Sequence, residues 1–541
     1  MRATMSDPSR RALLGLIPAA AAVPLWGQSS GYRTHNILEY GAKGDGRTLD
    51  TAAVQRAIDA CHGDRGGVVL VPAGDFLVGT LELKSNVTLH LSATGRLLGS
   101  GKPGDYSAGK GVPPGNGNVV LLYAVEAENV TIEGPGTIDG QGQLFYTGKG
   151  DNTGPGGNAA EGYRERPHLG IFYRCRNVVV RDVFLTRSAY HCVRLLECRY
   201  VRLDGVRIHN RVNLNNDGFH INSNQYVNIV NCNVICQDDA CALFGSNKFI
   251  TVTNCTFSTR WSIFRFGSGE CEEVAISNCV IYDTFGCVIK MRFSAGARIE
   301  NVSFSNLVMR NVTGPISIGL DSNYRRAANA PARAKGVVRN LTFQGIRATV
   351  VSEGGQYADM PFRNNFRPGE TRSCITLNGV GDEYLEGITM NDVHVTYGGG
   401  GTAEEAARRE IPKMAGEYFE LGTLPAYGLY ARNVRGLTLS DVRFELAAPD
   451  LRPAMVFDHV QDATVNGFAA QGNVQAELLR FIDSRDVLVS AARVLTPAAA
   501  FLQLEGEGNG GITVDGGDLS KAREAVALKA GAKMDAVKVR G

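Results

Sequence analysis

The stretches "NVVVRDVFL" (177–185), "YVRLDGVRI" (200–208) and "YVNIVNCNV" (226–234) repeat one phrase, and this phrase decides the fold. In each copy, apolar residues alternate with polar ones over two short runs, and a polar or glycine-containing pair separates the runs. Alternation with a period of two is typical of β-strands. The phrase therefore predicts two short strands in every copy.

The copies recur at a nearly constant distance along the chain. The first apolar residues of six copies are Val178, Val201, Val227, Ile250, Val274 and Val302, with intervals of 23, 26, 23, 24 and 28 residues. A propeller blade would need about 40 residues and four strands, whereas this period fits one turn of a parallel β-solenoid. We therefore predict an all-β protein with a single right-handed parallel β-helix.

One β-helical domain is expected to span residues 31–541. The stretch 50–76 begins with an acidic cap, and the apolar residues before Gly66 and Gly67 have helical spacing, which predicts a helix that covers the open N-terminal end of the solenoid. Its helically spaced apolar residues are Ala53, Val54, Ala57, Ile58 and Cys61. Irregular insertions, which in solenoids often wall a binding groove, are predicted at about 100–118, 141–166, 352–371 and 396–424.

The N-terminal segment, residues 1–27, has the features of an export signal. Ser9, Arg10 and Arg11 precede a short apolar run that ends in small residues, which is typical of a twin-arginine signal peptide. A basic N-terminal helix is the alternative interpretation. No later segment approaches the ~18 consecutive apolar residues of a membrane-spanning helix. We expect a protein that is exported to the periplasm or outside the cell, with no membrane contact after signal removal.

Composition excludes several other partners. The net charge is +2, and Lys and Arg are scattered among Asp and Glu, so no basic face for nucleic acid is expected. Cys232, Cys255 and Cys279 recur at the period of the fold, which predicts small buried residues rather than disulfides. Because the sequence has no Cys/His grouping with zinc spacing, we expect no metal. We also expect no cofactor and a monomeric protein.

Three aspartates interrupt the repeat: Asp217 in "NNDG" (215–218), and Asp238 and Asp239 in "QDD" (237–239). They are 21 and 22 residues apart, about one coil, and residues one coil apart lie about 4.8 Å from one another. Such proximity raises the pKa of at least one carboxyl group, which provides the acid and the base of glycoside hydrolysis. The alternative is that Asn, Asp and Gly simply form coil corners.

These motifs resemble those of the polygalacturonase family, glycoside hydrolase family 28. "NNDG" is similar to the family's NTD motif, and "QDDACAL" (237–243) to its GDDCIAI-like motif. Further similar stretches follow in the family's order: "YGAKGDGRTLDTAAVQRAIDAC" (40–61), "GTIDGQG" (136–142), "RPHLGIFYRCRNVVVRDV" (166–183), "GCVIKM" (286–291) and "GPISIGLDSNY" (314–324). The resemblance implies a right-handed parallel β-helix and inverting hydrolysis by the three aspartates. It implies that Asp238 or Asp217 activates water, and Asp239 is our choice for the general acid.

Two family motifs are altered in this chain. The family's GHG motif should fall near 258–262, but its histidine has no counterpart and Trp261 stands at about that place. The RIK motif aligns with residues 288–290, so Lys290 is retained while the arginine is lost. In polygalacturonases the arginine and the lysine of the RIK motif hold the substrate carboxylate, and a planar guanidinium is not easily replaced. The resemblance therefore supports hydrolysis more firmly than it supports recognition of galacturonate.

Other residues are candidates for substrate binding. Arg292 or Arg265 is expected to project onto the same groove as Lys290. Arg265 lies between Phe264 and Phe266, whose side chains should face inward and leave Arg265 on the outside surface beside the aspartates.

Three further positions complete the predicted site. Trp261 is either a platform for sugar stacking or a corner residue packed against an insertion. Tyr324 matches a family tyrosine near the substrate, and Asn215 lies beside Asp217 in the sequence. For His220 we expect a structural hydrogen bond rather than a role in the groove.

The sequence thus predicts an exported glycoside hydrolase that cleaves a pectin-like or related plant polysaccharide or oligosaccharide by inversion. A polysaccharide lyase or epimerase on the same solenoid, with a Lys or Arg base and often calcium, is one alternative. A carbohydrate-binding solenoid without catalytic activity is another.

Overall fold

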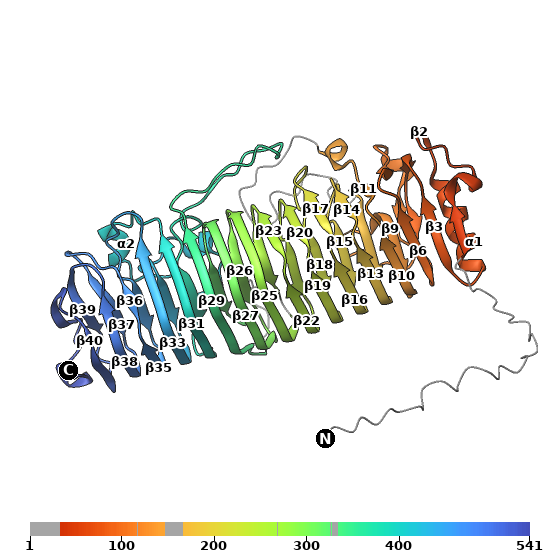
Figure 1. Ribbon diagram of the computed structural model, residues 1–541. Coiled ribbons are helices and arrows are strands. Elements are labelled where there is room, and N and C mark those ends of the chain that lie inside the picture. The colour runs from red at the N-terminus through yellow and green to blue at the C-terminus, as the bar shows by residue number, and fades with distance from the viewer. Residues whose placement is uncertain are drawn as a thin grey trace, which may run out of the picture. The chain divides into compact units, whose positions relative to one another are not determined.

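The computed structural model describes residues 33–115, 117–146, 166–267, 269–324, 326 and 334–540. The predicted signal peptide and residues 147–165 of one predicted insertion lie outside them. From β1 (Arg33–Asn36) to β42 (Val537–Arg540), the described chain winds into successive coils whose strands pair in parallel (Figure 1). The predicted right-handed parallel β-helix is confirmed. No helix in the described ranges has the length and apolar character needed to cross a membrane.

Each coil contributes one strand to a sheet of 16 strands, which we call sheet B. Its strands in chain order are β5 (Leu81–Glu82), β8 (Ser107–Ala108), β9 (Val119–Val125), β12 (His168–Tyr173), β15 (Val193–Leu196), β18 (Phe219–Asn222), β21 (Cys241–Phe244), β24 (Ser262–Phe266), β26 (Cys287–Phe293), β28 (Ile316–Leu320), β30 (Ile375–Gly379), β32 (Leu429–Arg432), β34 (Met455–Asp458), β37 (Glu477–Ile482), β39 (Ala498–Glu505) and β41 (Ala522–Lys529). Only β8 pairs antiparallel among these described strands.

The repeated phrase itself forms the other sheet, sheet A, which has 26 strands. In the central coils the phrase gives two strands: β13 (Arg176–Arg181) and β14 (Phe184–Thr186), β16 (Arg199–Asp204) and β17 (Arg207–Asn210), β19 (Gln225–Val230) and β20 (Asn233–Cys236), and β22 (Asn247–Thr253) and β23 (Thr256–Thr259). In later coils the two runs merge into single long strands: β25 (Glu270–Thr284), β27 (Arg298–Val312), β29 (Val337–Val350), β31 (Leu385–Tyr397) and β33 (Val434–Leu446).

The polar pair within each phrase bends the chain. Asn231, Asn254, Asn278 and Asn306 at these points have φ values of 57°, 55°, 54° and 53°. This left-handed conformation is unfavourable for most L-residues, whereas Asn tolerates it because its short side chain forms local hydrogen bonds. The recurring Asn in the sequence is therefore the local cause of the bend.

The inward side chains of both sheets form one continuous apolar core. Phe304 and Phe343 stack in adjacent coils with ring centroids 5.2 Å apart and an interplanar angle of 2°. All twelve cysteines are buried and none forms a disulfide, so the prediction that Cys232, Cys255 and Cys279 are small buried residues is confirmed.

The predicted N-terminal helix is present as α1 (Thr51–Gly63), and its five predicted apolar residues are all buried. The acidic residue before it has a different role from the one expected. The Asp50 side chain does not cap the helix, because its two oxygens accept hydrogen bonds from the backbone N–H groups of Lys43 and Gly44, at 2.8 and 3.0 Å. Asp50 thus fixes the preceding loop against the helix.

Three of the predicted insertions carry short elements of their own, and segment 141–166 contains η3 (Gly142–Phe145). Segment 100–118 contains η2 (Pro103–Asp105) and β8, which pairs with β9. Segment 396–424 contains α2 (Ala403–Ala407) and α3 (Tyr418–Leu421). The Tyr418 hydroxyl donates to the carbonyl oxygen of Ile316 at 2.9 Å, so the 396–424 insertion lies against sheet B.

Truncation of the aromatic stack tests this core. Phe304→Ala is expected to lower the free energy of unfolding by about 3–5 kcal/mol, because it removes a stacked ring and leaves a cavity. Val308→Ala is the matched control on the same strand, since Val308 is 49% exposed, and it should change stability by less than about 1 kcal/mol. Denaturant unfolding of both variants measures the difference, and equal effects would contradict the assigned core.

Candidate active site

The register of sheet B brings the three aspartates together. Asp217 lies two residues before Phe219 and Asp239 two residues before Cys241, and Phe219 pairs with Cys241 in adjacent strands. The Gly218 N–H donates to the Asp239 carbonyl oxygen at 2.9 Å, so Asp239 lies over Asp217. By the same register, Asp238 lies over Asn216 of the lower coil. The three carboxyl groups therefore occupy two neighbouring coils at one corner of the solenoid.

Asp217 is the most enclosed member of this cluster. It is 4% exposed, and its Oδ2 lies 2.8 Å from His220 Nδ1. Burial, and then the charge of Asp239, raises the pKa of Asp217 well above the usual aspartate value. Burial also lowers the pKa of His220 to about 3, so this histidine is neutral. The structural hydrogen bond expected of His220 is thus made to Asp217 itself.

Asp238 differs from Asp217 and Asp239 because it is partly exposed, whereas the other two are buried. Its Oδ1 accepts a hydrogen bond from the Asp239 N–H at 2.9 Å, and Asn215 Nδ2 lies 3.4 Å from its Oδ2. Desolvation, followed by the charges of the two neighbouring aspartates, raises the pKa of Asp238 well above the usual value. An accessible carboxyl group with a raised pKa has the properties of a general acid.

Ser262 is a member of the site that the sequence reasoning missed. Cys241 pairs with Phe264, which places Ser262, rather than Trp261, over Asp239 in the next coil. The Ser262 hydroxyl donates a hydrogen bond to Asp239 Oδ1. Adding the 23-residue period to the number of Asp239 gives this position, so the signal was present in the sequence.

Arg265 and Lys290 are neighbours on the outer face of sheet B, since the register pairs them between β24 and β26. Phe264 and Phe266 face the core, as predicted. Arg265 faces outward, as predicted, but it does not lie on an exposed surface as expected, since the residue is only 7% exposed. Burial, followed by the charge of Arg292, lowers the pKa of Arg265.

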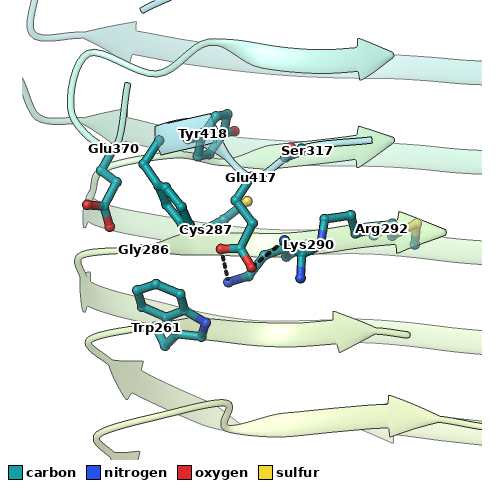
Figure 2. Close-up of a pocket in the computed structure, with 12 residues that line it drawn as sticks. Trp261, Gly286, Cys287, Lys290, Arg292, Ser317, Glu370, Glu417 and Tyr418 are labelled. Atoms are coloured by element: carbon teal, nitrogen blue, oxygen red, sulfur yellow. Dashed lines mark hydrogen bonds and ion pairs between the residues drawn. The ribbon is translucent and has the colours of Figure 1, made fainter. Parts of the chain in front are cut away.

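Lys290 and Arg292 are paired with acidic residues of the 396–424 insertion (Figure 2). Glu417 Oε2 lies 3.2 Å from Lys290 Nζ, and Glu417 Oε1 lies 2.7 Å from Arg292 Nη1. Glu420 accepts a hydrogen bond from the Tyr324 hydroxyl at 2.9 Å and pairs with Arg292 at 3.2 Å. No sequence signal identified Glu417, which is 127 residues from Lys290 and follows an irregular segment.

Trp261 adopts the packed arrangement rather than an open platform. The residue is 9% exposed, and its ring lies against the same insertion, with its centroid 6.4 Å from that of the Phe419 ring. Lys290 Nζ is 4.2 Å from the Trp261 ring centroid, a cation–π distance. A small pocket lies among Trp261, Lys290, Glu417 and neighbouring residues.

One group of described residues has the composition of a metal site. His191, Asp217 and His220 each offer one ligand atom, and these atoms lie within 4.8 Å of one another. However, the two imidazole rings stack with centroids 4.4 Å apart and planes at 20°, so their nitrogen lone pairs do not converge on one point. The arrangement suits hydrogen-bonded support of Asp217 better than metal binding.

A carboxyl group with a raised pKa beside other carboxyl groups is an arrangement that hydrolases of glycosidic bonds use. Sequence comparison identifies the family. The model of Glycosyl hydrolases family 28 matches residues 61–413, and the chain belongs to this family. It is therefore a polygalacturonase-like glycoside hydrolase that acts on O-glycosyl bonds.

Individual relatives agree with this assignment. An exopolygalacturonase of Zea mays is 24% identical over 381 residues, which cover 67% of this chain and 84% of that protein. An exo-poly-alpha-D-galacturonosidase of Dickeya chrysanthemi is 28% identical over 387 residues, 60% of this chain and 57% of that protein. The family 28 exopolygalacturonase structure of Yersinia enterocolitica has a TM-score of 0.62 at 22% identity, over 81% of this chain and 79% of that one.

The pKa shifts of the cluster predict how stability depends on pH. Asp217 and Asp238 bind protons more tightly in the folded state, so their stabilising contribution is complete below the usual aspartate pKa of about 4 and is lost as pH rises through their raised pKa values. Asp238→Asn removes one of these charges. The variant should melt at a higher temperature than the wild type at pH ~7, and this advantage should vanish near pH ~4.

Thermal melts across this pH range provide the measurement. The matched control is Asp462→Asn, at an exposed position with φ of 55° that Asn tolerates. Its difference from the wild type should remain small at every pH. A variant Asp238→Asn that is less stable than the wild type at neutral pH would contradict the coupled cluster.

Proposed function

We propose that this protein is an exported hydrolase that cleaves a pectin-like polysaccharide with inversion at the anomeric carbon, and that the Asp217, Asp238 and Asp239 cluster performs the reaction. The observation that carries the proposal is the environment of Asp238. Asp238 is partly exposed, and partial burial together with the two neighbouring aspartates raises the pKa of its carboxyl group. Single-displacement hydrolysis requires one such acid and one carboxylate that activates water.

Asp238 is assigned as the general acid, in place of Asp239, which the sequence first suggested. In this proposal the Asp238 carboxyl group donates its proton to the glycosidic oxygen as the bond from that oxygen to the anomeric carbon breaks. A water molecule attacks the opposite face of the sugar and loses a proton to Asp239. Each turnover then leaves Asp238 ionised and Asp239 protonated, and exchange of one proton with solvent restores both groups.

The contacts of Asp239 and Asp217 support this division of roles. The Ser262 hydroxyl donates a hydrogen bond to Asp239 Oδ1 and thereby fixes the position of this carboxyl group, as a general base requires. Asp217 lies under Asp239 and is held by His220, so it is suited to position the attacking water from below. Asn215 and Arg265 lie beside Asp238 and Asp239 and are proposed to bind the substrate. Glu417 and Glu420 pair with the other predicted binding residues, Lys290, Arg292 and Tyr324, and the same insertion covers Trp261.

Two arguments support an extracellular pectic substrate. The relatives described above are named for their action on polygalacturonate, and the basic pair Arg10 and Arg11 with the following apolar run predicts export. Polysaccharides of plant cell walls lie outside the cell, so both arguments lead to the same location.

Asp238→Asn tests the assigned acid. The substitution should lower kcat by about 10²–10⁴-fold, because the amide cannot donate a proton to the leaving oxygen. Asp462→Asn should keep the wild-type rate. A screen of pectic polysaccharides with NMR of the first-formed anomer measures both rate and stereochemistry. Retention of configuration, or an unchanged rate in Asp238→Asn, would contradict the proposal.

A further inference from the structure

Three cationic side chains gather on the outer face of sheet B next to the aspartates. Arg265 lies on β24, and Lys290 and Arg292 lie on β26, where Lys290 is the register neighbour of Arg265. Arg265 and Lys290 are 7% and 5% exposed, and the Arg292 side chain is 10% exposed. Burial of several cations at one place is unfavourable unless an anion accompanies them. This part of the groove is therefore built to hold negative charge.

The anion in this structure is part of the protein. Glu417 is 6% exposed and bridges Lys290 and Arg292 through its two oxygens (Figure 2). Burial acts to raise the pKa of Glu417, but Lys290 and the two arginines outweigh burial and hold the pKa at about 2. Glu417 is thus ionised throughout the range in which the protein would work, and it fills the cationic site with one carboxylate.

The segment that carries Glu417 is seated closely on sheet B. The Tyr418 hydroxyl donates to the carbonyl oxygens of Ile316 and Cys374, at 2.9 and 3.0 Å. A Cβ atom at Gly314 would lie 2.3 Å from the Tyr418 ring, and one at Gly319 would lie 3.0 Å from Ala415 Cα. Two glycines thus allow an approach that other residues would block, so Glu417 belongs to the wall of the groove.

A substrate carboxylate cannot pair with Lys290 and Arg292 while Glu417 holds both of them. A second carboxylate beside Glu417 and Glu420 would also meet like charges at a site with little solvent screening. The hydroxyl groups of a neutral sugar, in contrast, can donate hydrogen bonds to these carboxylates.

We propose that Glu417 is a specificity-determining residue, which occupies internally the place of a substrate carboxylate and thereby makes the protein select a neutral sugar unit beside Trp261 and Lys290. This inference rests on the proposed function for its substrate class, a polysaccharide of the pectic type. It assigns the recognition step to the 396–424 insertion and leaves the aspartates to perform the reaction.

Binding of a matched pair of monosaccharides tests the proposal without turnover. Galacturonate and galactose differ in the carboxylate, and their effect on the melting temperature is measured for the full-length wild type and for Glu417→Ala. Galacturonate should leave the wild type unchanged and should raise the melting temperature of Glu417→Ala by about 2 °C or more at saturating concentration. Galactose should not produce this selective shift.

Two variants control the measurement. Glu410→Ala removes an exposed glutamate from the same insertion and should behave like the wild type. Glu417→Gln keeps the side-chain volume, so it replaces Glu417→Ala if the smaller side chain prevents folding, and the same selective shift is expected. Stabilisation of the wild type by galacturonate overturns the proposal by itself, and so does the absence of a selective shift in both Glu417 variants.

Hydrolysis provides a second readout that separates this inference from the proposed function. Polygalacturonate and its carboxyl-reduced form, in which galactose units replace galacturonate, are compared as substrates. The ratio of kcat/KM for the neutral polymer to that for the acidic polymer should exceed one in the wild type and fall by about 10-fold or more in Glu417→Gln. A wild type that prefers the acidic polymer overturns the inference, whereas absence of hydrolysis on every pectic polymer contradicts only the proposed function.

Discussion

The parallel pairing of one coil on the next is the constraint on which the rest of this molecule depends. Because side chains one coil apart lie over one another, the pairing of Phe219 with Cys241 fixes Asp239 over Asp217, and the pairing of Cys241 with Phe264 adds Ser262 above them. Backbone hydrogen bonds and a continuous apolar core hold this register. The cluster of like charges, unfavourable by itself, is therefore imposed by interactions distributed along the solenoid.

The sequence predicted the parts of the molecule that the repeat determines. The alternating phrase predicted the strands, the polar or glycine-containing pair marked the break between them, and the period predicted that carboxylates from different coils would meet. The period also gives the position of Ser262, but the approximate match to the family's GHG motif indicated Trp261 instead. Helical spacing predicted α1 together with its buried face, because both follow from local pattern alone.

The part of the site that the sequence did not predict comes from the insertion. Glu417 reaches Lys290 across 127 residues, and no periodicity relates the two positions. Their contact depends on how an irregular segment lies on sheet B, which Tyr418 and the close approach at Gly314 decide. The same distinction separates the two proposals: the repeat accounts for the proposed hydrolytic cluster, and the insertion accounts for the proposed choice of sugar.

The pH dependence of kcat/KM, on the pectic polymer that the protein cleaves fastest, tests the hydrolytic cluster most directly. A general acid with a raised pKa must be protonated in the free enzyme, so the account predicts that the rate falls on the alkaline side with an apparent pKa well above the usual aspartate value of about 4. A rate that already falls near pH ~4 as the pH rises, as an isolated aspartic acid would give, would contradict the coupled cluster of Asp217, Asp238 and Asp239.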